Sequence, residues 1–202
     1  MNTEDAFHDE MVIEVRGGRG GHGARHFRRE KFVPNGGPDG GDGGRGGDVI
    51  LIADRGLSTL QDPRFRQAIC AEDGGPGEGS NRHGASSRSI TLRVPIGTVV
   101  EDADTGEQLA DLTEHRQEFI AARGGNGGFG NARFKTATRQ APDFSLPGRE
   151  GEHRNLRLTL KLIADVGFIG LPNAGKSTLL GQTSAAKPRV ANAHRHHLRA
   201  VG

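Results

Sequence analysis

Residues 36–48 read GGPDGGDGGRGGD, and this stretch decides the fold. Its glycines recur three residues apart in two registers, which leaves one larger residue in each triplet. A period of three fits neither an α-helix nor a β-strand, but it fits polyproline II, which has three residues per turn. Glycine on two faces of such a helix lets neighbouring backbones approach closely. The stretch therefore predicts a left-handed extended helix packed against others of its kind.

The same period returns in shorter runs at residues 17–23, 74–77 and 124–130. Polyproline II has no internal hydrogen bonds, so packed helices must find their partners in one another. Some polar side chains within or beside these runs can bond to neighbouring backbones: Arg19, Asp39, Asp42, Arg45 and Asn126. The alternative is that the runs are flexible linkers, although linkers are usually Gly/Ser-rich and keep no register.

Short apolar pieces between the glycine runs predict β-strands at residues 11–16, 48–53, 89–94, 99–100, 118–122 and 156–162. In the last piece, leucines at every second position alternate with Arg157, Thr159 and Lys161, which is typical of a strand with one buried face. Many short strands joined by glycine-rich connections favour a small β-barrel or sandwich. The expected fold of residues 1–163 is therefore mainly β with glycine-rich polyproline-II helices.

Composition narrows the class of protein. Glycine supplies 33 of the 202 residues, tryptophan and tyrosine are absent, and the net charge is +2. Much of the basic character lies in residues 187–202, which contain no acid, so the charge is weak support for nucleic-acid binding by the rest. The single Cys70, expected to be buried, excludes an internal disulfide and a multi-cysteine zinc site. No apolar run is long enough to span a membrane, so we expect a cytoplasmic protein.

Residues 170–177 read GLPNAGKS and fit the phosphate-loop pattern G-x-x-x-x-G-K-[ST], between a strand candidate at 165–169 and a helix candidate at 177–186. Gly170 and Gly175 let backbone N–H groups point at phosphates, and Lys176 reaches the β- and γ-phosphates. The hydroxyl of Ser177 is the expected magnesium ligand. The predicted nucleotide-binding residues are Gly170, Leu171, Pro172, Asn173, Ala174, Gly175, Lys176, Ser177 and Thr178. The alternative is an accidental glycine turn with an exposed lysine.

Several of these motifs resemble one known family. The stretches FRREKFVP (27–34), GGPDGGDGGRGGDV (36–49), VPIGT (94–98), GGNGGFGN (124–131), LKLIADVG (160–167) and PNAGKST (172–178) are similar to those of the Obg GTPases. The resemblance covers residues 6 to 191. It implies an Obg fold, with glycine-rich helices on a small β-barrel, followed by a Ras-like domain that binds GTP or GDP with Mg²⁺. It also implies a role on the large ribosomal subunit in bacterial ribosome assembly and stress control.

The resemblance ends near Ala191. No threonine follows Thr183 and no carboxylate follows Asp165, so the sequence offers no switch threonine, second magnesium ligand or guanine-reading acid. We expect an Obg-like domain at 1–163 and an incomplete α/β P-loop domain at 164–202. Its tail at 193–202, with three histidines, is interpreted as a frameshifted or artificially ended stretch and not as a metal site.

The expected function is that of an Obg-type GTPase, a monomer without a membrane span. In this chain we expect weak GTP binding, hydrolysis that is absent or severely reduced, and no catalytic residue. The alternative is a non-enzymatic module that docks on ribosomal RNA or protein and carries a vestigial phosphate loop.

Overall fold

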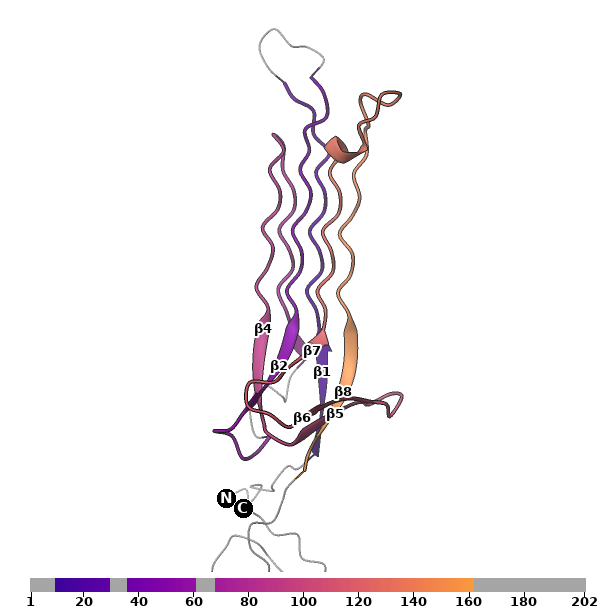
Figure 1. Cartoon of the computed structure of the whole chain (residues 1–202). Helices are drawn as coiled ribbons and strands as arrows, with labels where there is room; N and C mark the ends of the chain where they lie inside the picture. The colour runs from indigo at the N-terminus through magenta and orange to yellow at the C-terminus, as the bar shows by residue number, and fades with distance from the viewer. Residues whose placement is uncertain (1–9, 30–35, 61–67, 162–202) are drawn as a thin grey trace, which may run out of the picture. The chain divides into compact units, whose positions relative to one another are not determined.

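Eight β-strands gather at one end of the first of two structural units (Figure 1). The computed structural model describes residues 10–29, 36–60 and 68–161, and the chain divides into units Met1–Leu160 and Lys161–Gly202. The predicted phosphate loop, Ser177 and the tail lie outside the described residues. The strands are β1 (Glu10–Arg16), β2 (Val49–Asp54), β3 (Ile69–Cys70), β4 (Ile90–Pro95), β5 (Thr98–Asp102), β6 (Gln108–Leu112), β7 (Glu118–Ala122) and β8 (His153–Leu160).

The strands form two sheets, one with the order β3-β1-β8-β5-β6 and one with the order β4-β2-β7. In the larger sheet β1 and β8 are antiparallel, with Glu10 opposite Thr159 and Arg16 opposite His153. The alternation predicted for β8 is confirmed, because Leu156, Leu158 and Leu160 are buried in the core. Buried apolar residues of β2, β4 and β7, which form the smaller sheet, pack in the same core. The unit is mainly β and, among its described residues, its only helical element is the 3-10 turn Asn131–Phe134.

Two strands and one burial state differ from the sequence-based expectation. β3 has only two residues and β6 reads QLADL, so neither carries enough alternation to be recognised. Cys70 was expected to be buried, and it is exposed. Side chains of successive strand residues point to opposite faces. Ile69 takes the core-facing position of this edge strand, so Cys70 faces outward.

Six extended segments rise side by side from the strands and form a glycine bundle (Figure 1). Each segment continues directly into or out of a strand, so the bundle extends from the sheets. In chain order the first to sixth segments are residues 17–28, 36–48, 71–79, 82–89, 123–130 and 142–152.

Hydrogen bonds in the bundle run between segments with a period of three. Amides of the first segment at Gly18 and Gly21 donate to Gly47 and Gly44 of the second, at 2.9 and 2.8 Å. The intervening amide of Gly20 instead donates to Arg149 of the sixth segment, at 2.8 Å. A three-residue repeat turns successive amides toward different neighbours, as polyproline II requires. The predicted packed helices are therefore confirmed.

The glycines are required by space. A Cβ built on Gly43 would lie less than 3.0 Å from the carbonyl oxygen and carbon of Gly21, and one built on Gly44 would meet Ala85 in the same way. Backbone fills both directions, so neither neighbour can move aside as a side chain would. Positive φ angles occur among the described glycines only at Gly97 and Gly106, so the runs do not use glycine for its φ range. The flexible-linker alternative is wrong for these runs.

Two carboxylates in the strand region are expected to make the unit sensitive to acid. Hydrogen bonds from Arg16 and His153 hold the pKa of Glu14 below its usual 4.5. Backbone N–H groups of Thr105 and Asp104 hold the pKa of Asp102 below 3.8. A pKa lowered by folding stabilises the protein above the unfolded value, and this contribution is lost as pH falls through the folded value.

We therefore expect the urea midpoint to fall as pH drops below 4.5, the usual pKa of Glu14. The decline should be shallower in Glu14→Gln and in Asp102→Asn, each of which removes one titrating group. Urea unfolding curves followed by circular dichroism, recorded at several pH values from about 3 to about 7, measure how the midpoint changes across the range in which these carboxylates titrate. Parallel profiles for the parent and both variants would contradict the assignment.

Candidate functional site

The far end of the glycine bundle joins its segments in pairs (Figure 1). We call it the distal end and define it as the described residues among 24–42, 78–83 and 129–146. Loops held on a rigid scaffold are the usual place for binding residues. The bundle is such a scaffold, because each of its segments is hydrogen-bonded to at least two others.

Asp39 joins the first segment to the turn that connects the third and fourth segments. One carboxylate oxygen lies 2.5 Å from Nδ1 of His26, and the other accepts the N–H of Ser80 at 3.1 Å. The Asp39 carbonyl also accepts the N–H of Asn81 at 2.6 Å. Ser80 and Asn81 have φ angles of 59° and 55°, so the turn that they form is tight and left-handed. Asp39 therefore fixes the turn between the third and fourth segments against the first.

Asn131 fastens the remaining connection and is fully buried. Its Oδ1 accepts the N–H of Gly40 at 2.9 Å. Its Nδ2 donates to the carbonyls of His26 at 2.9 Å and Pro142 at 3.2 Å. One side chain thus ties the first, second and sixth segments. Sequence reasoning did not single it out, because its partners are distant in the chain.

Carboxylates of the second segment complete the bonding of the fifth. Asp42 accepts the N–H of Gly130 at 2.8 Å, and Asp48 accepts that of Gly124 at 2.7 Å. The prediction that Asp39 and Asp42 bond to neighbouring backbones is confirmed. For the other three residues the prediction is wrong. The side chains of Arg19 and Arg45 pair with Glu150 and Asp48, and Asn126 makes no side-chain hydrogen bond within the described residues.

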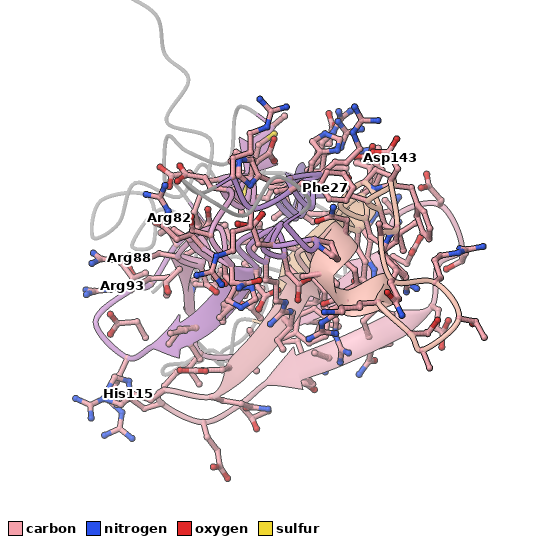
Figure 2. All side chains as sticks on the ribbon, turned by 90° about the horizontal axis from the view of Figure 1, so that it is seen from above. Phe27, Arg82, Arg88, Arg93, His115 and Asp143 are labelled. Carbon is pink, nitrogen blue, oxygen red and sulfur yellow. The ribbon has the colours of Figure 1, made fainter. Side chains whose placement is uncertain are left out.

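Basic side chains outnumber acidic ones at the distal end. The basic ones described there are Arg25, Arg28, Arg29, Arg82, Arg133, Lys135 and Arg139, and the acidic ones are Asp39, Asp42, Glu78 and Asp143. Every one of these acids contacts a cationic or histidine side chain. Seen from above, Arg82 projects from one side of the unit and Asp143 lies on the other (Figure 2). The distal end therefore presents net positive charge to a partner.

Three phenylalanine rings meet on the distal end. Phe134 lies between Phe129, with ring centroids 6.4 Å apart, and Phe144, with centroids 4.6 Å apart. The guanidinium of Arg133 lies 4.4 Å from the centroid of Phe129. We call Phe129, Phe134, Phe144 and the adjacent exposed Leu146 the aromatic patch. The only sequence signal for it was the position of Phe129, which takes the non-glycine place in the GGNGGFGN run.

Other classes of site find no support in the described residues. No group of histidine, cysteine, aspartate and glutamate side chains is arranged to hold a metal ion in this part of the chain. Within the same residues, no helix has the length and apolar character needed to cross a membrane. The described unit therefore offers a charged and aromatic contact surface as its candidate site.

Comparisons with known proteins agree with the fold. The family model described as GTP1/OBG matches residues 8–162. Proteins named "GTPase Obg" are similar over most of this chain: that of Desulfitobacterium hafniense (strain DSM 10664 / DCB-2) is 57% identical over 188 residues, which cover 93% of this chain and 44% of the relative. That of Moorella thermoacetica is 59% identical over 186 residues, covering 92% and 44%.

The relative from Persephonella marina is 54% identical over 186 residues, which cover 92% of this chain and 55% of its own length. The chain thus spans about half the length of the curated relatives that it matches. The matched family model covers the strands and the whole glycine bundle described above. On this match and on the sequence identity, the chain belongs to the GTP1/OBG family.

Proposed function

We propose that the protein is a GTP- and magnesium-binding GTPase that acts on the large ribosomal subunit during ribosome assembly in the cytoplasm. One observation carries the proposal: a GTP1/OBG match over residues 8–162 is followed in the same chain by the phosphate-loop sequence GLPNAGKS at 170–177. The relatives named "GTPase Obg" support the same activity. A phosphate loop alone cannot read the base, so the preference for guanine rests on family membership.

The phosphate-loop residues divide the work of holding a nucleotide. Backbone amides after Gly170 and Gly175 would face the phosphates, and Lys176 would neutralise the β- and γ-phosphates. The Ser177 hydroxyl is a hard oxygen donor of the kind that Mg²⁺ prefers. In this chain Ser177 is the residue that would hold the ion. Bound Mg²⁺ supplies charge neutralisation for phosphoryl transfer.

The first unit would then be the part that docks. Its described residues form a rigid bundle with a basic distal end and no candidate metal centre. Rigid elements bind with little loss of conformational entropy. Basic side chains suit the phosphate backbone of ribosomal RNA. In this division of labour, nucleotide binding and ribosome contact belong to different units of the chain.

Nucleotide titration of the 202-residue chain tests the proposed activity. We expect weak binding of GTP, GDP and ATP that requires Mg²⁺ and is lost in Lys176→Ala. Isothermal calorimetry with all three nucleotides provides the measurement. Binding of GTP and GDP in preference to ATP would support the proposed activity. No binding of any nucleotide would contradict it and favour a docking module with a vestigial phosphate loop.

Co-sedimentation with purified large ribosomal subunits tests the proposed docking. We expect the chain to sediment with the large subunit at low salt and to dissociate as salt rises, because contacts to phosphates release counterions. The double variant Arg29→Glu/Lys135→Glu should sediment less. Equal sedimentation of parent and variant, or none with the parent, would contradict docking through the distal end.

A further inference from the structure

We propose that the aromatic patch is a stacking platform for unpaired bases of an RNA strand. This inference rests on the docking part of the proposed function and assigns the contact to a particular surface. Three of the six large hydrophobic side chains exposed in the described residues lie here, so the exposure is concentrated and not scattered. They are Phe129 at 41%, Phe144 at 38% and Leu146 at 42%.

The outer rings are exposed because of the bundle's geometry. In the fifth segment Gly127 and Gly128 are pressed against neighbouring backbones, which leaves the third position, Phe129, to point outward. The backbone on both sides of the patch is fixed, since the N–H of Leu146 donates to the carbonyl of Phe129 at 2.9 Å. Phe134 is partly buried between the outer rings and supports them. The rings are therefore held in place before any partner arrives, which lowers the entropic cost of binding.

Two arginines frame the rings. The guanidinium of Arg133 lies over Phe129 and is also held by Asp42 at 2.9 Å. Arg139 lies 5.5 Å from the centroid of Phe144 and has no carboxylate partner among the described residues. Phe144 beside Arg139 is therefore the combination that binds single-stranded nucleic acid, since a base stacks on the ring and a phosphate meets the cation.

Charge and shape favour RNA over an apolar protein partner. The acids of the distal end are already engaged, whereas Arg139 and Lys135 have no acidic partner within the described residues. Arginines interrupt the apolar surface of the patch, so a protein partner with a continuous hydrophobic face would fit it poorly. A paired duplex would keep its bases stacked inside, so the rings select unpaired ones. Asp143, the chain neighbour of Phe144, lies on the opposite side of the unit from Arg82, Arg88 and Arg93 (Figure 2).

The absence of tryptophan and tyrosine provides a direct probe. Phe129→Trp introduces a single fluorophore, and titration with a single-stranded RNA of about 12 nucleotides is expected to quench it, because stacked bases quench indole. A strand of the same length without bases should bind through its phosphates and leave the fluorescence unchanged. Equal quenching by the baseless strand, or no quenching by RNA that binds, would overturn the platform.

Affinity measurements on the 202-residue chain complete the test. By fluorescence anisotropy, Phe129→Ala and Phe144→Ala should each weaken binding of labelled single-stranded RNA about 5- to 150-fold, the range for loss of one base–ring stack. Asn126→Ala is the matched control, because Asn126 takes the same outward position one triplet earlier and is also exposed. Phe129→Tyr, which keeps the ring, should bind as the parent does.

The outcomes separate this inference from the proposed docking. If the chain sediments with large subunits and Phe129→Ala does so equally well, with unchanged RNA affinity, the platform is wrong while docking stands. If Asn126→Ala weakens RNA binding as much as Phe129→Ala, the effect is not stacking and the platform is also wrong. Thermal melts check that Phe129→Ala is folded, and Phe129→Leu, which keeps apolar bulk without the ring, should show the same loss of RNA binding.

Discussion

Gly43→Ala is expected to unfold at a much lower temperature than the parent protein. The new Cβ would meet the carbonyl oxygen and carbon of Gly21 at less than 3.0 Å, and the Gly43 amide already donates to Gly128 at 2.9 Å. Three segments must therefore move apart together. Overpacking of this kind costs about 3 kcal/mol, which in a unit of this size corresponds to a fall of about 6–12 °C.

The control for this substitution lies in the same glycine run. A Cβ on Gly37 would have only the Nζ atom of Lys135 within reach, at 3.7 Å, and would touch no backbone. Gly37→Ala is therefore expected to leave the midpoint unchanged or slightly raised, since alanine restricts the unfolded chain. Thermal melts of both variants measure the difference. An unchanged midpoint for Gly43→Ala, repeated at Gly40 and Gly46, would contradict close packing of the bundle.

Local sequence patterns were sufficient to predict the bundle and most strands. The three-residue glycine period indicates where there is no room for a side chain, because another backbone lies against each face of the helix that carries glycine. The leucine alternation of β8 works in the same way for the core, where Leu156, Leu158 and Leu160 are buried and Arg157 is exposed. Such patterns predict structure well because the same packing constraint acts at each repeat along the chain.

Features that depend on single distant contacts could not be predicted. β3 is held by parallel pairing with β1, more than 50 residues away, and its two residues carry no period. The aromatic patch joins Phe129, Phe134 and Phe144, whose spacing matches neither the glycine period nor a strand. The phosphate loop is the opposite case, because its residues are consecutive and their chemistry is local. The sequence alone is therefore enough to predict it, and it stays a prediction.

Asn131 is the strongest example of such a distant contact, and its loss is expected to loosen the distal end. Asn131→Ala would leave the buried N–H of Gly40 and the buried carbonyl of Pro142 without their partner. The carbonyl of His26 would lose one of its two donors and keep the N–H of Asp39, at 3.0 Å. Each buried unpaired group costs about 1–3 kcal/mol, so we expect a loss of about 3 kcal/mol or more. Urea unfolding measures it, with the exposed Asn126→Ala as the near-neutral control.

The second substitution, Asn131→Asp, separates hydrogen bonding from packing at this position. Aspartate has nearly the same shape and can still accept from the Gly40 N–H, but its ionised carboxylate cannot donate to the His26 and Pro142 carbonyls. Two acceptors would then face a buried negative charge, so Asn131→Asp should be at least as destabilising as Asn131→Ala at neutral pH. Protonation restores one donor, so the deficit relative to Asn131→Ala should shrink in acid. Native-state hydrogen exchange should show faster exchange at Gly40 and Asp39 in both variants, with the amides of β1 and β8 still protected. Uniform loss of protection in the strands instead would mean that Asn131 supports the whole unit and not the distal end alone.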